Sequence, residues 1–205
     1  YFRKDDLAPH LRGKLLRLAA FQNPDFLQTQ RMRLSTFGKP RVIACGRETA
    51  EFIVIPRGCR DAAFALLSAH GAKITVDDRR ETGSPQGFEF LGALRDNEML
   101  RHDDGILAAG TAFGKTVAAL WLVAERNTTT LVLVNRRQLL EQWVQRIASF
   151  LGIPEKEIGR IGGGRRKETG RIDVATIQSL QRRGVVDECV GRYGFVVIDE
   201  CHAIS

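Results

Sequence analysis

The chain has 205 residues, of which 43% are hydrophobic and 27% are charged, and its net charge is +7. This length allows one large domain or two modest ones, and the composition is sufficient for a buried core. The apolar runs fall well short of the roughly 18 residues that cross a bilayer, and no signal peptide is recognisable at the amino terminus. We therefore expect a cytoplasmic protein with no membrane partner.

The positive charge is concentrated in the first half of the chain. Residues 1–95 hold 16 Lys and Arg against 10 Asp and Glu, a difference of +6, whereas residues 96–205 hold 15 against 14, a difference of +1. A basic excess of this kind favours a polyanionic partner such as nucleic acid. A solvated basic face is an equally good interpretation of the same pattern.

Residues 1–93 predict a helical region followed by a small α+β accessory unit. Helices are expected over 6–21, from Asn23-Pro24-Asp25 onward, and over 60–70. The second start is typical because an Asn side chain caps free N–H groups and Pro fits the first helical position. Strands are expected at 41–45 and 52–55, joined as a hairpin, and at 73–76 and 88–91, with a loop at 77–87 between them. Residues 41–92 would then form a ββαββ unit.

From Gly105 the pattern changes to short apolar runs that alternate with amphipathic segments. The runs predict strands at 106–109, 131–134, 159–161, 172–175 and 195–198, and helices are expected at 114–125 and 136–150. Continuous apolar strands between helices are typical of a parallel sheet covered on both faces. The expected fold class is therefore α/β, and Trp121 and Trp143 are expected in its core.

The stretch from Ala109 to Thr116 has the composition of a phosphate-binding loop between a strand and a helix. The residues expected to surround a nucleotide triphosphate are Gly110, Thr111, Ala112, Phe113, Gly114, Lys115 and Thr116. Small residues let backbone N–H groups converge on phosphate, Lys115 would reach the β and γ phosphates, and the Thr116 hydroxyl would ligate Mg²⁺. The first position of the usual pattern is Ala109 instead of Gly.

A second motif lies 84 positions after Lys115. The apolar run at 195–198 ends in Asp199 and Glu200, at the edge where parallel sheets keep their ligands. We expect Asp199 to hold the Mg²⁺ shell and Glu200 to act catalytically on the attacking water, with Lys115 as its catalytic partner on the phosphates. The alternative is a polar strand end that faces solvent.

Together, the loop and the Asp-Glu-Cys-His run make residues 94–205 resemble the first RecA-like domain of a superfamily-two helicase of the DEAD/DEAH type, in the branch of restriction subunits and excision-repair enzymes. Such helicases often begin the loop with Ala, as at Ala109, and place Asp-Glu-x-His on the second strand. The resemblance implies a DEAH box, ATP and Mg²⁺ as cofactors, DNA as partner, and a second RecA-like domain that this chain lacks. A chain limited to these residues should hydrolyse ATP poorly, because a partner domain supplies the arginine finger.

Three residues are expected to contact nucleic acid. Arg136 and Arg137 follow the strand at 131–134 and resemble motif Ia of these helicases, where a strand end touches the nucleic-acid backbone. Thr176, after the basic loop at 162–167, resembles the motif Ib region of double-stranded DNA translocases. Solvated arginines and a solvated basic loop are the alternative interpretations.

Two departures from the family pattern keep other functions open. Glu98 stands where the family usually has a Gln that reads adenine, and the connection from Glu98 to Gly105 is short for the usual helix. A nucleic-acid-binding module with a degenerate nucleotide site is therefore the main alternative, and a P-loop ATPase unrelated to nucleic acid is the third. Residues 31–57 resemble the accessory region of primase-helicase proteins from TOTE-type conflict systems.

Overall fold

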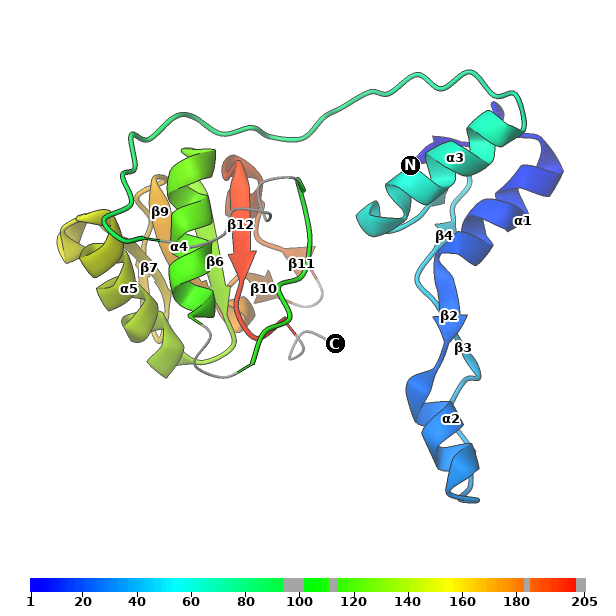
Figure 1. Cartoon of the computed structure of the whole chain (residues 1–205), viewed down its shortest axis with the longest axis horizontal. Helices are drawn as coiled ribbons and strands as arrows, with labels where there is room; N and C mark the ends of the chain where they lie inside the picture. Colours follow the sequence, from blue (N-terminus) through cyan, green and yellow to red (C-terminus); the bar gives the residue numbers. More distant parts are fainter. Residues whose placement is uncertain (94–101, 111–113, 183–184, 202–205) are drawn as a thin grey trace. The chain divides into compact units, whose positions relative to one another are not determined.

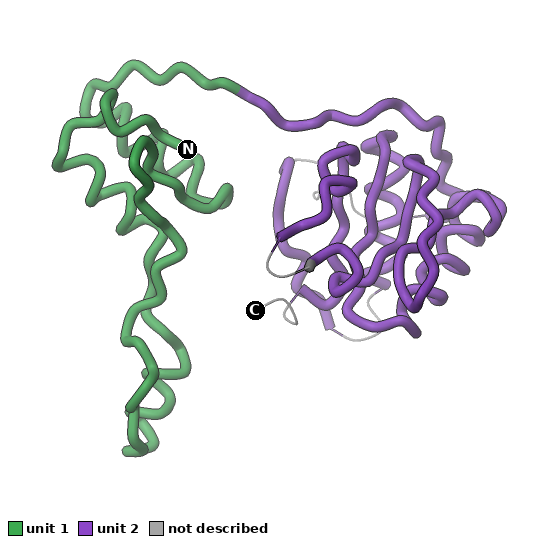
Figure 2. The backbone as a smooth tube through the Cα atoms, turned by 180° about the vertical axis from the view of Figure 1, so that it is seen from behind, with its two compact units in different colours: residues 1–77 green, residues 78–205 purple. Residues whose placement is uncertain are grey.

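The computed structural model describes residues 1–93, 102–110, 114–182 and 185–201. Its contacts divide the chain into two compact units, Tyr1–Asp77 and Asp78–Ser205 (Figure 2). This division falls 16 residues before the predicted start of the ATPase domain at residue 94. No helix in the described ranges is long and apolar enough to cross a membrane.

The first unit is a set of short elements around a small core. Its elements are β1 (Phe2–Arg3), α1 (Pro9–Leu18), β2 (Ala20–Gln22), α2 (Pro24–Arg31), β3 (Val42–Ala44), β4 (Arg47–Glu48), β5 (Phe52–Val54), η1 (Arg57–Cys59) and α3 (Arg60–Ala69). The buried residues come from the first helix region, β5 and α3: Leu7, Leu11, Leu15, Ile53, Ala63 and Leu67. All three predicted helices are confirmed, although α1 is three residues shorter than expected at each end, and β2 takes the place of its predicted last turn.

The start of α2 is formed as its sequence predicts. The Asn23 side chain accepts a hydrogen bond from the Asp25 N–H at 3.0 Å and donates one to the Pro40 carbonyl at 2.9 Å. The first bond caps the helix, and the second fixes the chain that returns after it. One local signal therefore organises both the helix start and a contact 17 residues further on.

The predicted ββαββ unit at 41–92 is wrong. β3 pairs with β2, and β5 pairs with β1 and β4, so the segments at 41–45 and 52–55 do not form a hairpin with each other. Residues 73–76 and 88–91 are extended but make no ladder. One apolar side chain of each segment packs on a core instead: the partly buried Ile74 lies against the core of the first unit, and Phe88 lies in the core of the second.

The second unit is a five-stranded sheet with two long helices. Its elements are α4 (Lys115–Arg126), β6 (Thr130–Val134), α5 (Arg137–Leu151), η3 (Glu155–Glu157), β7 (Gly159–Gly162), β8 (Arg165–Lys167), β9 (Ile172–Thr176), η4 (Ile177–Ser179), β10 (Gln181–Arg182), β11 (Val185–Val186), η5 (Glu188–Arg192) and β12 (Phe195–Ile198). The strand order is β12-β6-β9-β7-β8, and the β12–β6, β6–β9 and β9–β7 pairs are parallel. The α/β fold class with a parallel sheet is confirmed.

The two faces of this sheet are covered differently, as alternation along β6 shows. Val132 and Val134 face a core that includes Leu120 of α4 and Trp143 of α5. Leu131 faces a smaller cluster that includes Leu180, Cys189 and Tyr193. Helices α4 and α5 therefore cover one face together, and they lie side by side in front of the sheet in Figure 1.

A segment ahead of the predicted domain boundary is attached to this sheet unit. The Asn127 side-chain oxygen accepts the backbone N–H groups of Gln86, Gly87 and Phe88, at 2.7 to 3.2 Å. The Arg171 guanidinium lies 5.7 Å from the Phe88 ring centre. These contacts explain why most of the predicted loop at 77–87 belongs to the second unit.

The predicted strand at 106–109 is wrong. Its residues have no strand assignment, and Ile106 is 81% exposed. A strand exists only as one member of a hydrogen-bonded pair, and the sheet formed by the described residues ends at β12. The apolar composition of 106–109 is typical of a strand, but the segment has no neighbouring strand to pair with among the described residues.

Candidate nucleotide site

Three parallel strands bring the predicted site residues to one edge of the sheet. Val134 at the end of β6 lies opposite Thr176 at the end of β9, and Ile198 of β12 lies opposite Leu133 of β6. The residues that follow these strands must therefore share the carboxyl edge. This is the edge at which open α/β sheets bind ligands.

Helix α4 begins at the same edge. It packs against β12, and Figure 1 shows its amino-terminal end beside the arrowhead of that strand. Gly114 precedes it with φ of 88°, a left-handed conformation that a glycine adopts without strain. Lys115 is the first helical residue, and its ammonium donates to the Ala109 carbonyl at 3.1 Å, across the loop.

The amino terminus of α4 is suited to an anion. No side chain caps it, because the preceding residue is Gly114. The N–H groups of its first turn are therefore directed at the loop, and together with the Lys115 ammonium they form a positive end where a phosphate fits. Thr116 is partly buried in this first turn, and Gly110 is exposed. Thr111, Ala112 and Phe113 lie outside the described residues.

Asp199 is oriented by the alternation of β12. Phe195 and Val197 pack on the helix side of the sheet, so Asp199, two positions further, is directed to that side as well. There its Oδ2 accepts a hydrogen bond from the Trp143 indole at 2.8 Å, and its Oδ1 accepts the Glu200 backbone N–H at 3.0 Å. A carboxylate beside the uncapped start of α4 is an oxygen ligand of the type that Mg²⁺ prefers.

Glu200 lies at the end of the same strand but in a different environment. Its φ is 52°, in the left-handed region that a residue with a side chain rarely adopts, and it is exposed. The hydrogen bond from its N–H to Asp199 accompanies this backbone turn. The turn separates the two adjacent carboxylates: Asp199 faces the helices, and Glu200 is open to solvent. His202 lies outside the described residues.

The two predicted nucleic-acid arginines begin helix α5. Arg136 is the N-cap residue, and its carbonyl accepts the N–H groups of Leu139 and Leu140. Both Arg136 and Arg137 are exposed. A side chain added at Gly163 would place its Cβ 2.7 Å from the Arg137 side-chain Nε, so Arg137 lies against the glycine loop between β7 and β8.

Thr176 occupies the same edge but is more enclosed than predicted. It is 7% exposed, and its hydroxyl is hydrogen-bonded to the Ser179 hydroxyl at 2.6 Å. A Cβ at Gly162 would lie 2.7 Å from the Thr176 hydroxyl oxygen, so only glycine fits beside it. The structure thus brings Thr176 and the Arg137 side chain to the same glycine loop.

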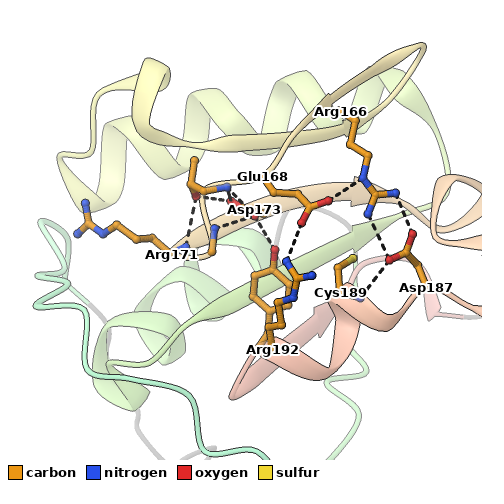
Figure 3. Close-up of polar contacts among 10 residues, drawn as sticks. Arg166, Glu168, Arg171, Asp173, Asp187, Cys189 and Arg192 are labelled. Atoms are coloured by element: carbon orange, nitrogen blue, oxygen red, sulfur yellow. Dashed lines mark hydrogen bonds and ion pairs between the residues drawn. The ribbon is translucent and has the colours of Figure 1, made fainter.

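Two basic residues outside this loop form ion pairs with carboxylates of the same unit. Arg166 lies between Glu168 and Asp187, with nitrogen–oxygen distances of 2.6 and 2.8 Å, and Arg192 binds the far side of Glu168 (Figure 3). The Arg166 hydrogen bond lowers the pKa of the Asp187 carboxyl well below its usual range. Arg166 therefore links the β7–β8 hairpin to the start of η5 through exposed ion pairs, and Arg165 is exposed as well.

A buried carboxylate fixes the start of β12 on the other face of the sheet. Asp173 is fully buried and accepts hydrogen bonds from the Thr169 hydroxyl, the Thr169 and Gly170 N–H groups and the Tyr193 hydroxyl (Figure 3). Burial, followed by the hydrogen bond to Asp173, raises the pKa of the Tyr193 hydroxyl above its usual value. This contact holds the segment that leads into the Asp199 strand.

Sequence reasoning missed two polar groups at this edge. Trp143 was predicted as core, which is correct for its ring, but its N–H reaches Asp199. The side-chain oxygen of Asn135 is buried, and no hydrogen-bond partner for it exists among the described residues. The position of Asn135 directly after a parallel strand could have indicated a site residue, but no sequence pattern indicated the indole contact.

Known proteins share both the sequence and the fold of this chain. A protein of Invertebrate iridescent virus 6 named as helicase 161L is 28% identical over 188 residues, which cover 84% of this chain and 40% of that protein. The DNA 3'-5' translocase XPB2 of Sulfurisphaera tokodaii is 33% identical over 103 residues, 50% of this chain and 22% of that protein. The crystal structure of the UvsW helicase from bacteriophage T4 has a TM-score of 0.61 at 16% identity, covering 97% of this chain and 78% of that chain.

The sheet order and the structural match show a RecA-like fold. Together with the family match below and the helicase relatives, they assign this unit as the first RecA-like domain of a superfamily-two helicase. The model of the family "Type III restriction enzyme, res subunit" matches residues 82–205, and the chain belongs to this family. It spans less than half the length of the two curated relatives named above. The resemblance of residues 31–57 to TOTE-type proteins stays a prediction.

Proposed function

We propose that this chain is the amino-terminal part of an ATP-dependent DNA helicase or translocase with a DEAH box, which acts in the cytoplasm. The observation that carries the proposal is that Lys115 and Asp199 lie at one edge of the parallel sheet, with Arg136 and Arg137 beginning a helix at the same edge. Membership of the family of type III restriction enzyme res subunits and the names of the relatives support it.

The residues fit ATP and Mg²⁺ in distinct roles. The first turn of α4 and the Lys115 ammonium would bind phosphates, and the Thr116 hydroxyl and Asp199 would hold the metal. When bound, Mg²⁺ would neutralise charge that develops on the phosphates. Glu200, exposed at the strand end, would orient the attacking water and accept its proton. A second RecA-like domain outside this chain would close on the nucleotide and supply arginines.

The phosphate-loop assignment is tested with Lys115→Ala. Removal of the only side-chain cation of the loop should abolish most ATP binding without loss of the fold, measured by equilibrium binding and by thermal unfolding. Lys156→Ala, which removes an exposed ammonium from the same unit, is the matched control and should bind ATP normally. If the unmodified protein itself does not bind ATP, the alternative of a degenerate nucleotide site is correct.

Substitutions of the two carboxylates should have different effects on nucleotide binding and hydrolysis in the full-length protein. Asp199→Asn should weaken metal-dependent nucleotide binding as well as hydrolysis, because it removes charge from the metal shell. Glu200→Gln should retain ATP and Mg²⁺, lose turnover by orders of magnitude, and hold DNA in the ATP-bound state. Normal turnover in Glu200→Gln, or a binding loss equal to that of Asp199→Asn, would contradict these roles.

The nucleic-acid edge is tested by salt dependence. If Arg136 and Arg137 each neutralise a phosphate, replacing either with Ala should reduce the slope of log affinity against log salt by about 1 and weaken binding uniformly across sequences. Arg146→Ala is the control, since Arg146 is an exposed arginine nine residues further along α5. A slope that is equal in all three variants would exclude phosphate contact at the start of α5.

A further inference from the structure

We propose that Trp143 is a positioning residue of the nucleotide site: its indole N–H fixes the orientation of the Asp199 carboxylate toward Mg²⁺, and through it the placement of helix α5 sets the geometry of the metal shell. This inference rests on the proposed function, because it assumes that Asp199 is a metal residue. It goes beyond that function in assigning a role to a tryptophan and to the helix that carries it.

The contact joins two elements that are far apart in the sequence. The Trp143 Nε1 atom lies 2.8 Å from the Asp199 Oδ2 atom, across 56 positions of chain. Trp143 is 3% exposed, and its ring belongs to the core cluster that α5 forms with α4 and the sheet. The indole therefore cannot turn independently of α5, and its N–H is directed at one fixed point beside the end of β12.

A carboxylate at this place needs such a partner. The torsion that turns an Asp carboxylate is broad, so the backbone alone does not select one orientation. The two described donors select it: the Glu200 N–H binds Oδ1 at 3.0 Å, and the indole binds Oδ2. Each carboxylate oxygen accepts at two sites, so one site on each oxygen is left for the metal shell. Outer partners of this kind orient metal ligands and adjust their affinity.

The same tryptophan connects this carboxylate to the predicted nucleic-acid edge. Helix α5 runs from Arg137 to Leu151, with Arg136 as its N-cap. Trp143 lies six residues after Arg137, which is about 9 Å along a helix axis. Because a packed helix moves as one body, a phosphate contact that displaces its first turn also displaces the indole. Trp143 is thus the point at which α5 contacts the nucleotide site.

The contact is more specific than core packing requires. A buried indole needs a hydrogen-bond acceptor, but any backbone carbonyl would satisfy it. Here the acceptor is a charged side chain at the edge where the phosphate-binding helix begins. Phenylalanine in place of Trp143 would fill most of the same volume and remove only the donor, so the role can be separated from packing.

The test compares Trp143→Phe with Trp121→Phe, the same substitution at a partly buried tryptophan of α4. For each, the affinity for a non-hydrolysable ATP analogue is measured without metal and as a function of Mg²⁺, and Mn²⁺ paramagnetic resonance reports on the metal shell. Trp143→Phe should weaken the apparent Mg²⁺ affinity about 10-fold. It should leave metal-free nucleotide affinity unchanged and alter the Mn²⁺ spectrum. Trp121→Phe should change none of these.

An unaltered Mg²⁺ dependence in Trp143→Phe would overturn the inference, and so would an equal loss in both variants. Asp199→Asn is measured in parallel. If it too leaves the Mg²⁺ dependence unchanged, the failure belongs to the proposed function, because Asp199 is then not a metal residue. Should Trp143→Phe not fold, the indole N–H resonance of Trp143 in the unmodified chain decides: it should shift when Mg²⁺ and nucleotide bind, and a constant resonance would overturn the proposal.

Discussion

The two units of this chain are stabilised in different ways. In the first, the strands are two or three residues long, and the described residues form one buried cluster of six side chains. In the second, four strands of the five-stranded sheet are joined by parallel pairs, and fourteen buried side chains form the cluster between sheet and helices. Small cores bury less surface per residue. Single helix caps and turns therefore contribute a larger share of the stability of the first unit.

The difference in strand pairing between the two units indicates which of them can form a binding site. Parallel strands pack helices on both faces and leave one edge at which the ends of distant segments meet. Asp199 and Arg136 follow strand ends at that edge, and Thr176 is the last residue of β9 there. The first unit has no such convergence of strand ends among its described residues, because its strands are short and antiparallel.

Ile147→Ala should have the largest effect on stability. The side chain is fully buried in the cluster between α5 and the sheet. Its loss should destabilise the second unit by about 2–5 kcal/mol, because a cavity remains in a rigid, well-packed core. Denaturant unfolding monitored by hydrogen exchange would assign the loss to residues 78–205. Leu15→Ala should cost the first unit less, since short elements can collapse around the gap, and the reverse order would break the comparison.

Asp173→Asn should have the next largest effect. An amide accepts through one oxygen only and presents an N–H₂ group where the carboxylate accepted, so one or two of its buried donors lose their partner. The expected cost is about 1–3 kcal/mol. Chemical denaturation measures it, and the ultraviolet titration of Tyr193 should move back toward the usual pKa of a tyrosine. An unchanged stability would show that the loop before β9 contributes little.

Asn23→Ala should have a smaller effect, confined to the first unit. The substitution removes the cap of α2 and the bond to Pro40, and such caps contribute about 1 kcal/mol. Asn23→Asp is the control, because it keeps the acceptor and loses only the donated bond. Thermal unfolding of both variants should rank Ala below Asp. Equal losses would show that the Pro40 contact, not the cap, stabilises this helix.

Asp187→Asn should have the smallest effect on stability, and this effect should disappear in acid. The Arg166 hydrogen bond lowers the pKa of Asp187 in the folded state, so its contribution is present above the pKa of an unfolded aspartate, about 3.9. That contribution is lost as the pH falls toward the folded pKa. The unfolding free energy, measured against pH and salt, should therefore differ between variant and unmodified protein at pH 7 and converge in acid. A constant difference would contradict the ion-pair interpretation.

By itself, the sequence determined the elements whose cause is local or periodic. The cap at Asn23, the helices at 114–125 and 136–150, and the strands that became β6, β7, β9 and β12 all follow from spacing and side-chain chemistry within a few residues. It also placed Lys115 at the start of a helix and Asp199 directly after a parallel strand. That the two form one nucleotide site stays a prediction.

Pairing and long-range contacts were decided only by the tertiary structure. Whether 41–45 pairs with 52–55 or with β2, and whether 106–109 becomes a strand at all, depends on which segment lies beside each one, and no local pattern encodes that neighbour. The same holds for the Trp143 indole. Its spacing predicted burial correctly, but a hydrogen bond across 56 positions exists only because the end of β12 lies beside α5 in the folded unit.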